Sequence, residues 1–144
     1  MFVGEKNMHE LTGFLDSWTE DGSGVKKAFL YLRDSLSKRK GVRAKFIYRP
    51  GVSGSFRVSA GEGGASGRPL FALVDIIDDD PGNRWLSVCF YEDTINDPDE
   101  EGNLVPQGLL GEDGYCFDIT GYDASMMAYL DNRIEEAYSK AAGR

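Results

Sequence analysis

Asp75 is the residue whose type and position most suggest chemistry, because it interrupts an apolar run over residues 70–77. With a period of two residues, the side chains that share its face of the expected strand are Phe71, Leu73 and Ile77. A carboxylate among such residues needs a charged or hydrogen-bonding partner, since otherwise its pKa rises and its burial costs free energy. Asp75 is therefore the centre of our first candidate site.

The natural partners of Asp75 are the basic residues of the hairpin that precedes it in the chain. A three-residue turn over residues 50–52 pairs Phe46 with Phe56 and places the cations of this hairpin on the opposite face. Arg57 is expected to form an ion pair with Asp75, either with a structural role or as part of a binding surface for an anionic small molecule. The residues of this candidate surface are Asp75, Arg57, Arg49, Lys45, Trp85 and Tyr91.

The acidic segment 97–103 is the second candidate, as a divalent metal site. Its weak candidate ligands are Asp97, Asp99 and Glu101, which alternate along the chain before a glycine, as oxygen ligands do in the first half of a calcium-binding EF-hand loop. The position at which that loop needs a bidentate Glu is occupied by Gly108, and a strand rather than a helix is expected before the segment. The competing interpretation is an acidic turn exposed to water.

Nucleophilic, zinc or nucleotide chemistry has little support in the sequence. His9 is the only histidine and has no Ser or Cys near it, and Ser53 lacks the pattern of a nucleophile elbow. Cys89 and Cys116 have no C-x-x-C spacing and lie in apolar runs, so they are expected to be buried, reduced thiols. The glycine-rich segment 61–67 matches no phosphate-binding pattern and is expected to connect two strands. We expect no cofactor, and a catalytic function is not indicated.

Composition excludes several classes of protein. The chain has 144 residues, which suit a single globular domain over residues 1–144, and 41% of them are hydrophobic. The net charge of −8 argues against nucleic acid or an anionic membrane as a partner. The charge is unevenly distributed, since residues 26–57 contain ten basic residues and one acid while residues 75–118 contain thirteen acids and one base. No membrane-spanning run or signal peptide is recognisable, so a cytoplasmic location is expected.

The elements that must position these residues indicate an α+β fold. Helices are expected over residues 8–18, with Asn7 as a possible cap, from a cap at Ser23 towards Gly41, and from residues 120–123 to the end of the chain. Strands are expected over residues 43–49, 55–60, 70–77 and 84–91, with a possible short last strand over residues 115–118.

The resulting fold class is a single antiparallel sheet of four to five strands with two N-terminal helices and one C-terminal helix on one face. Both faces of the hairpin over residues 70–91 are largely apolar, so its strands are expected to be central in the sheet. The stretch over residues 93–114 is expected to be mostly irregular.

The leading functional hypothesis is a small cytoplasmic, non-catalytic binding or accessory protein. Its partner would be another protein, or a second copy of the chain, bound through the second face of the sheet. The first alternative is a binding protein or enzyme for an anionic small molecule that uses Asp75 and Arg57. The second alternative is divalent metal binding by the acidic segment.

Overall fold

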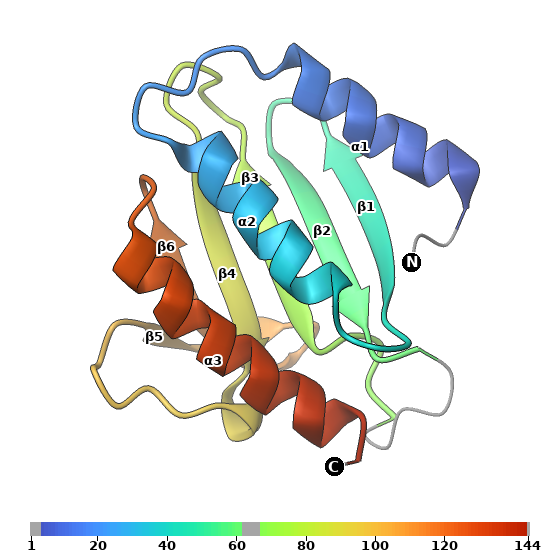
Figure 1. The fold of residues 1–144 in the computed structure, drawn as a ribbon, viewed down its shortest axis with the longest axis vertical. Helices are drawn as coiled ribbons and strands as arrows, with labels where there is room; N and C mark the ends of the chain where they lie inside the picture. Colours follow the sequence, from blue (N-terminus) through green and yellow to red (C-terminus); the bar gives the residue numbers. More distant parts are fainter. Residues whose placement is uncertain (1–3, 62–66, 144) are drawn as a thin grey trace.

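The computed structural model describes residues 4–61 and 67–143 and has an α+β fold, with three α-helices and one antiparallel sheet (Figure 1). The helices are α1 (Glu5–Ser17), α2 (Val25–Ser37) and α3 (Ala124–Ala141), with a short 3-10 helix η1 (Glu92–Thr94). The strands are β1 (Arg43–Arg49), β2 (Ser53–Ser59), β3 (Ala72–Ile77), β4 (Trp85–Tyr91), β5 (Asn103–Leu109) and β6 (Glu112–Ile119).

The order of the strands across the sheet is β1-β2-β3-β4-β6-β5. The central position expected for the hairpin of β3 and β4 is thus confirmed, and so is the order of helices and strands along the chain. The register of the first hairpin is also confirmed, because Phe46 lies opposite Phe56 and Lys45 opposite Arg57. Six strands form the sheet, however, instead of the four to five that we expected.

The strand that the sequence did not reveal is β5, in the stretch that we expected to be irregular. Its residues are mostly exposed and include Pro106 and Gly108, so it lacks the alternation of apolar and polar residues that identifies a strand. Proline is tolerated there because β5 is an edge strand and pairs only with β6. Its register with β6 shifts between Val105 and Leu109, which marks a bulge or irregularity.

The main hydrophobic core lies between the helices and one face of the sheet. Figure 1 shows α2 and α3 crossing this face, with α1 beside β1. In α3 the apolar residues at helical spacing are buried, namely Met127, Leu130, Ile134, Ala137 and Ala141. Val88 and Phe90 on β4 point into the same core, with 1% and 0% of their surface exposed.

Two of the expected helix caps are wrong. One side chain makes a tertiary contact instead, and another residue accepts the hydrogen bond expected for the other. Asn7 lies inside α1, where its amide accepts a hydrogen bond from the Phe46 N–H at 2.6 Å and donates one to the Phe46 carbonyl at 2.5 Å. This pair occupies part of the open edge of β1. At the start of α2 the carboxylate of Asp21, rather than Ser23, accepts from the Lys26 N–H at 2.8 Å.

The remaining expectations concern the ends of elements and the connection between β2 and β3. The third helix begins just after the expected start over residues 120–123, and Asp123 caps it by accepting a hydrogen bond from the Ser125 N–H at 2.9 Å. Most of the glycine-rich segment expected to connect two strands, residues 62–66, lies outside the described residues. None of the described helices is both long and apolar enough to cross a membrane.

Candidate functional site

The second face of the sheet, on the side away from the helices, carries a row of polar side chains that crosses four strands. Asp75 on β3 lies between Ser55 on β2 and Ser87 on β4. On its other side Ser87 faces Asp118 on β6. Paired residues on neighbouring strands share a face of the sheet, so two carboxylates flank Ser87. Their backbones are two strand spacings apart, which is about 10 Å.

A neighbouring row is less polar and continues to the edge of the sheet. From β2 to β5 it consists of Arg57, Leu73, Cys89, Cys116 and Asn103. A cavity of about 400 Å³ is lined by this row together with Asp75, Ser87 and Asp118. This volume falls in the range of small-molecule binding sites.

The β5–β6 hairpin closes one side of the cavity with Val105, Leu109 and Leu110. Leu109 is buried, and it approaches β6 at Gly114, where an added Cβ would lie 3.2 Å from the Leu109 Cβ. Leu110 has a positive φ of 51°, and Gly111 after it has a φ of 86°. Two consecutive positive φ angles make a tight hairpin turn in which Asn or Gly is usual, and here the first position holds a leucine against the cavity.

Asp75 is only partly satisfied within this cavity. Its Oδ1 atom is buried and has no hydrogen-bond partner among the described residues. Burial raises the pKa of the Asp75 carboxyl, and Ser55, Arg57 and Arg49 offset only part of that rise. The Asp75 carboxylate thus lines the cavity with one oxygen atom that no described donor satisfies.

The ion pair expected between Asp75 and Arg57 is not formed. The facing is as expected, because Val74, next to Asp75, pairs with Val88, and Asp75 therefore lies on the side away from Val88. The Arg57 Nε atom, however, donates to the Ser55 Oγ atom at 3.2 Å, and no ion pair within the described part of the chain includes Asp75. Residues on one face need not contact each other, and Arg57 has a hydrogen-bonding neighbour on its own strand.

The two cysteines form a disulfide, so the expectation of reduced thiols is wrong. Cys89 and Cys116 are directly opposite each other on β4 and β6, with Cα atoms 4.2 Å apart. Spacing along the chain could not indicate this, because the two cysteines are 27 positions apart in the sequence and only the strand register brings them together. The disulfide belongs to the wall of the cavity.

The other residues of the candidate surface do not line this cavity. Lys45 and Arg49 lie on the edge strand β1, and Arg49 acts on Asp75 only through its charge. Trp85 pairs with Ile77 at the far end of β4. Tyr91 is buried, with the Arg68 guanidinium 4.1 Å from its ring centre, and lines a separate cavity of about 150 Å³.

The candidate surface expected from the sequence did not include Ser87, Asn103 or Asp118 among its binding residues. The period-two alternation placed Ser87 on the face of Trp85 and Cys89, which was a usable signal. Asp118 could have been found in the same way from the short strand expected over residues 115–118. Asn103 had no such signal, because β5 was not recognised as a strand.

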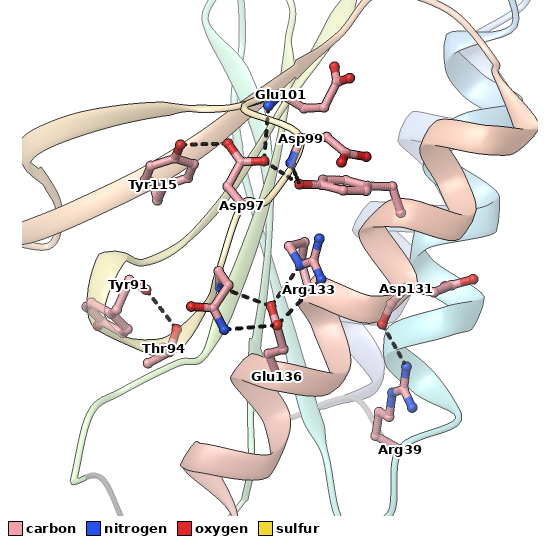
Figure 2. A network of polar contacts seen from close by, with 12 residues as sticks. Arg39, Tyr91, Thr94, Asp97, Asp99, Glu101, Tyr115, Asp131, Arg133 and Glu136 are labelled. Atoms are coloured by element: carbon pink, nitrogen blue, oxygen red, sulfur yellow. Dashed lines mark hydrogen bonds and ion pairs between the residues drawn. The ribbon is translucent and has the colours of Figure 1, made fainter.

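On the helix side of the sheet, Asp97 has the opposite environment, because its carboxylate accepts four hydrogen bonds. The hydroxyl groups of Tyr115, at 2.6 Å, and Tyr129 donate to it, and so do the N–H groups of Gly102, at 2.9 Å, and Glu101, at 3.0 Å. Figure 2 shows Tyr115 pointing towards this carboxylate. Burial alone would raise the pKa of Asp97, but these hydrogen bonds outweigh it and lower the pKa to about 2.

The loop that contains Asp97 is attached to α3 at further points. The Glu136 carboxylate accepts from the Asn96 N–H at 3.1 Å and from the Arg133 Nε atom at 2.7 Å (Figure 2). The Lys140 Nζ atom donates to the Asp93 carbonyl at 3.0 Å. The segment after β4 is therefore an ordered part of the fold.

These contacts bear on the metal candidates of the acidic segment. Both carboxylate oxygens of Asp97 already accept hydrogen bonds from protein groups, whereas Asp99 and Glu101 have exposed side chains. The described residues contain no cluster of three or more His, Cys, Asp or Glu side chains arranged to hold a metal ion. Asp97 thus organises its own loop.

Comparisons of the chain with protein-family models, with curated proteins and with solved structures found no match. No relative therefore contributes to the assignment of function. The α+β arrangement alone does not identify a function either, because one fold supports many. A functional assignment therefore depends on the chemistry of the residues that line the cavity.

Proposed function

We propose that this chain is a non-catalytic binding protein for a small polar molecule, which occupies the cavity on the second face of the sheet. The observation that carries the proposal is the buried Oδ1 atom of Asp75, which has no partner within the described structure. Leaving such an atom unpaired costs about 1 to 3 kcal/mol or more. A ligand that donates a hydrogen bond to it recovers this free energy.

The strained turn of the β5–β6 hairpin supports the same site. A leucine in the left-handed region costs roughly 1 to 2 kcal/mol relative to glycine, and such local costs cluster at functional sites. Leu110 is 51% exposed, so it does not recover this free energy by joining the core. Its contribution is to shape the wall of the cavity.

Binding is favoured over catalysis because the described lining of the cavity offers its one hydroxyl group, that of Ser87, no imidazole base. Its lining includes no histidine, and the sulfur atoms of Cys89 and Cys116 are joined to each other. His9 is exposed on α1, which packs on the other side of the sheet. Asp75 and Asp118 remain as polar groups that orient a ligand.

A fragment screen with a blocked cavity tests this proposal. Fragments with neutral, anionic and cationic head groups are screened by ligand-observed NMR and by thermal shift, since a ligand of the native state raises the melting temperature. We expect Val105→Trp, at the rim of the cavity, to abolish binding. Val52→Trp, in the exposed turn between β1 and β2, is the matched control and should retain it. Fragments that bind both variants equally, or no bound fragment at all, contradict the proposal.

A protein partner is the second candidate, and the apolar surface of the β5–β6 hairpin favours it. Leu104, Val105 and Leu110 have 52%, 37% and 51% of their surface exposed. The outer edge of β5 pairs with no other strand in the sheet, so it is free to pair with another chain. Sedimentation at increasing concentration tests self-association through this edge. A constant monomer mass, in wild type and in Leu104→Ser alike, contradicts that form of the proposal.

Location is a separate question. The sequence suggested the cytoplasm, where thiol-reducing systems keep most cysteines reduced. The disulfide between Cys89 and Cys116 is of the kind that persists in oxidising compartments. We therefore do not include a cytoplasmic location in the proposed function.

A further inference from the structure

We propose that the ligand of this cavity is an organic cation, with a primary ammonium or guanidinium group on a short apolar chain. This inference rests on the proposed binding function and specifies its ligand. It reverses the sign that the sequence suggested, because the basic residues of the first hairpin were expected to attract an anion. The tertiary structure distributes these charges differently.

The charged groups that line the cavity are predominantly acidic. Asp75 and Asp118 face it from the two sides of Ser87, and Arg57 is the one basic residue of its described lining. Arg57 lies in the neighbouring row and directs its Nε atom towards Ser55 at 3.2 Å. Lys45 and Arg49, which would have made the site basic, lie outside the cavity on β1.

The unpartnered Oδ1 atom of Asp75 sets the position of the cation. This atom accepts no hydrogen bond from the described residues, and the half-buried Asp75 side chain lines the cavity. A rotation of the carboxylate can therefore present Oδ1 to a donor in the cavity without breaking a hydrogen bond that the protein makes to this atom. A charged N–H donor makes a shorter and stronger hydrogen bond to a carboxylate than a neutral donor does. The Ser87 hydroxyl and the Asp118 carboxylate provide acceptors for the remaining N–H groups.

An organic cation fits this lining better than a metal ion does. A calcium site needs six to eight oxygen ligands, and the described residues hold no group of three or more metal-binding side chains. The rest of the cavity wall is apolar and includes Leu73, Leu109 and the disulfide. Such a wall favours a hydrocarbon chain attached to the cationic group.

Three probes with the same six-carbon chain separate the possibilities. Hexylammonium, hexanoate and hexanol share an unbranched six-carbon skeleton and have a cationic, an anionic and a neutral head group. Each is titrated into the whole chain by isothermal calorimetry and by thermal shift. We expect hexylammonium to bind, with the other two at least about tenfold weaker, because only it forms a charge-assisted hydrogen bond with Asp75.

Variants of the charged residues give effects of opposite sign. Asp75→Asn should weaken hexylammonium binding about tenfold or more, and Asp118→Asn should weaken it less. Arg57→Gln should strengthen it, because a like charge is removed from the cavity. Asp16→Asn, on the exposed surface of α1, controls for the change in net charge and should have no effect. All variants are compared as folded proteins, with circular dichroism as the check.

Each other outcome overturns the inference in a recognisable way. If hexanoate binds most tightly and Arg57→Gln abolishes its binding, the site is specific for an anion. If hexanol binds as tightly as hexylammonium, the site does not discriminate by charge. In both cases the proposed binding function survives if Val105→Trp abolishes the binding. If none of the probes binds and the fragment screen also fails, the proposed function falls together with the inference.

Discussion

Asp97 and Asp75 are carboxylates on opposite sides of one sheet, and the protein treats them in opposite ways. On the helix side, Asp97 accepts four hydrogen bonds and has a pKa of about 2. On the second side, burial raises the pKa of Asp75, whose Oδ1 atom accepts no hydrogen bond from the described residues. The sequence suggested Asp75 as the centre of the first candidate site and Asp97 as a weak candidate metal ligand. Of the two carboxylates, only that of Asp75 has an oxygen atom without a described hydrogen-bond donor.

The two sides of the sheet also differ in how closely their side chains are packed. The helix side is filled by large apolar side chains such as Phe90 and Phe117, which pack with ring centres 6.1 Å apart. The second side has a small apolar cluster at one end, the disulfide, and a cavity. The helix side therefore contains the main apolar core, and the second side contains the cavity in which we propose binding. The following predictions test this contrast, from the largest expected effect to the smallest.

Truncation of a core side chain on the helix side should have the largest effect. Phe90→Ala should lower the free energy of unfolding by about 3 to 5 kcal/mol, because it leaves a void in a dry core. Leu110→Ala, in the exposed turn beside the cavity, should change it by less than about 0.5 kcal/mol. Urea unfolding measures the free energy of unfolding of both variants. Equal losses would show that the second side carries as much of the core as the first.

The disulfide should be the main covalent support of the second side. Replacing both Cys89 and Cys116 by Ala should cost about 3 to 4 kcal/mol, because the crosslink closes a loop of 27 residues in the unfolded chain. A reducing agent should destabilise the wild type in urea by a similar amount and leave the double variant unchanged. Wild-type protein whose unfolding does not respond to the reductant would contradict this role.

Amide substitutions at the two carboxylates should differ in their cost. Asp97→Asn should destabilise by about 2 to 3 kcal/mol, since an amide cannot accept all four hydrogen bonds that the carboxylate accepts. Asp75→Asn should change stability by less than about 1 kcal/mol in either direction, because no ion pair is broken. Thermal and urea unfolding provide both values. A loss of several kcal/mol at Asp75 would instead point to a structural role.

The dependence of stability on pH should have opposite signs at the two sites. The ordinary pKa of an aspartate is 3.8, and the folded protein lowers that of Asp97 to about 2. The stability that Asp97 contributes is therefore complete above pH 4 and is lost as the pH falls towards 2. The raised pKa of Asp75 means that its ionisation costs stability as the pH rises through and above 3.8.

Unfolding of the wild type, Asp97→Asn and Asp75→Asn between pH 2 and pH 7 measures both signs. The stability difference between wild type and Asp97→Asn should shrink below pH 4. Any advantage of Asp75→Asn should be largest near neutral pH and should disappear in acid. Curves that run parallel for all three proteins would rule out the shifts at both positions.

Calcium should have the smallest effect, which is none within error. Millimolar calcium should leave the melting temperature unchanged, because the oxygens of Asp97 already accept hydrogen bonds from the loop, from β6 and from α3. Magnesium at the same concentration controls for ionic strength. A rise of several degrees that Asp97→Asn abolishes would restore the metal site that the acidic sequence suggested.

Much of the fold could be predicted because its signals are local. The apolar spacing of α3 and the alternation in β1 and β2 each identify an element and its buried face without reference to the rest of the chain. The turn over residues 50–52 then fixes the register of the first hairpin. β5 escaped prediction because an exposed edge strand with a proline has no core to mark it.

The candidate site was predicted only in part, for a related reason. Period two correctly placed Asp75, Arg57 and Ser87 on one face. It could not indicate which of these groups are in contact, because side chains on one face lie several ångströms apart and choose among neighbours. Arg57 accordingly donates to Ser55 rather than to Asp75.

The sequence by itself thus determined the α+β class, the central hairpin and the faces of its strands, since hydrophobic periodicity acts within one element. The tertiary structure alone decided that Cys89 meets Cys116, that Asp97 is saturated and that Asp75 opens onto a cavity. Each of these depends on strands or loops that come from distant parts of the chain. Hydrogen bonds and disulfides form only at short range, so the pairing of strands must bring their groups together first.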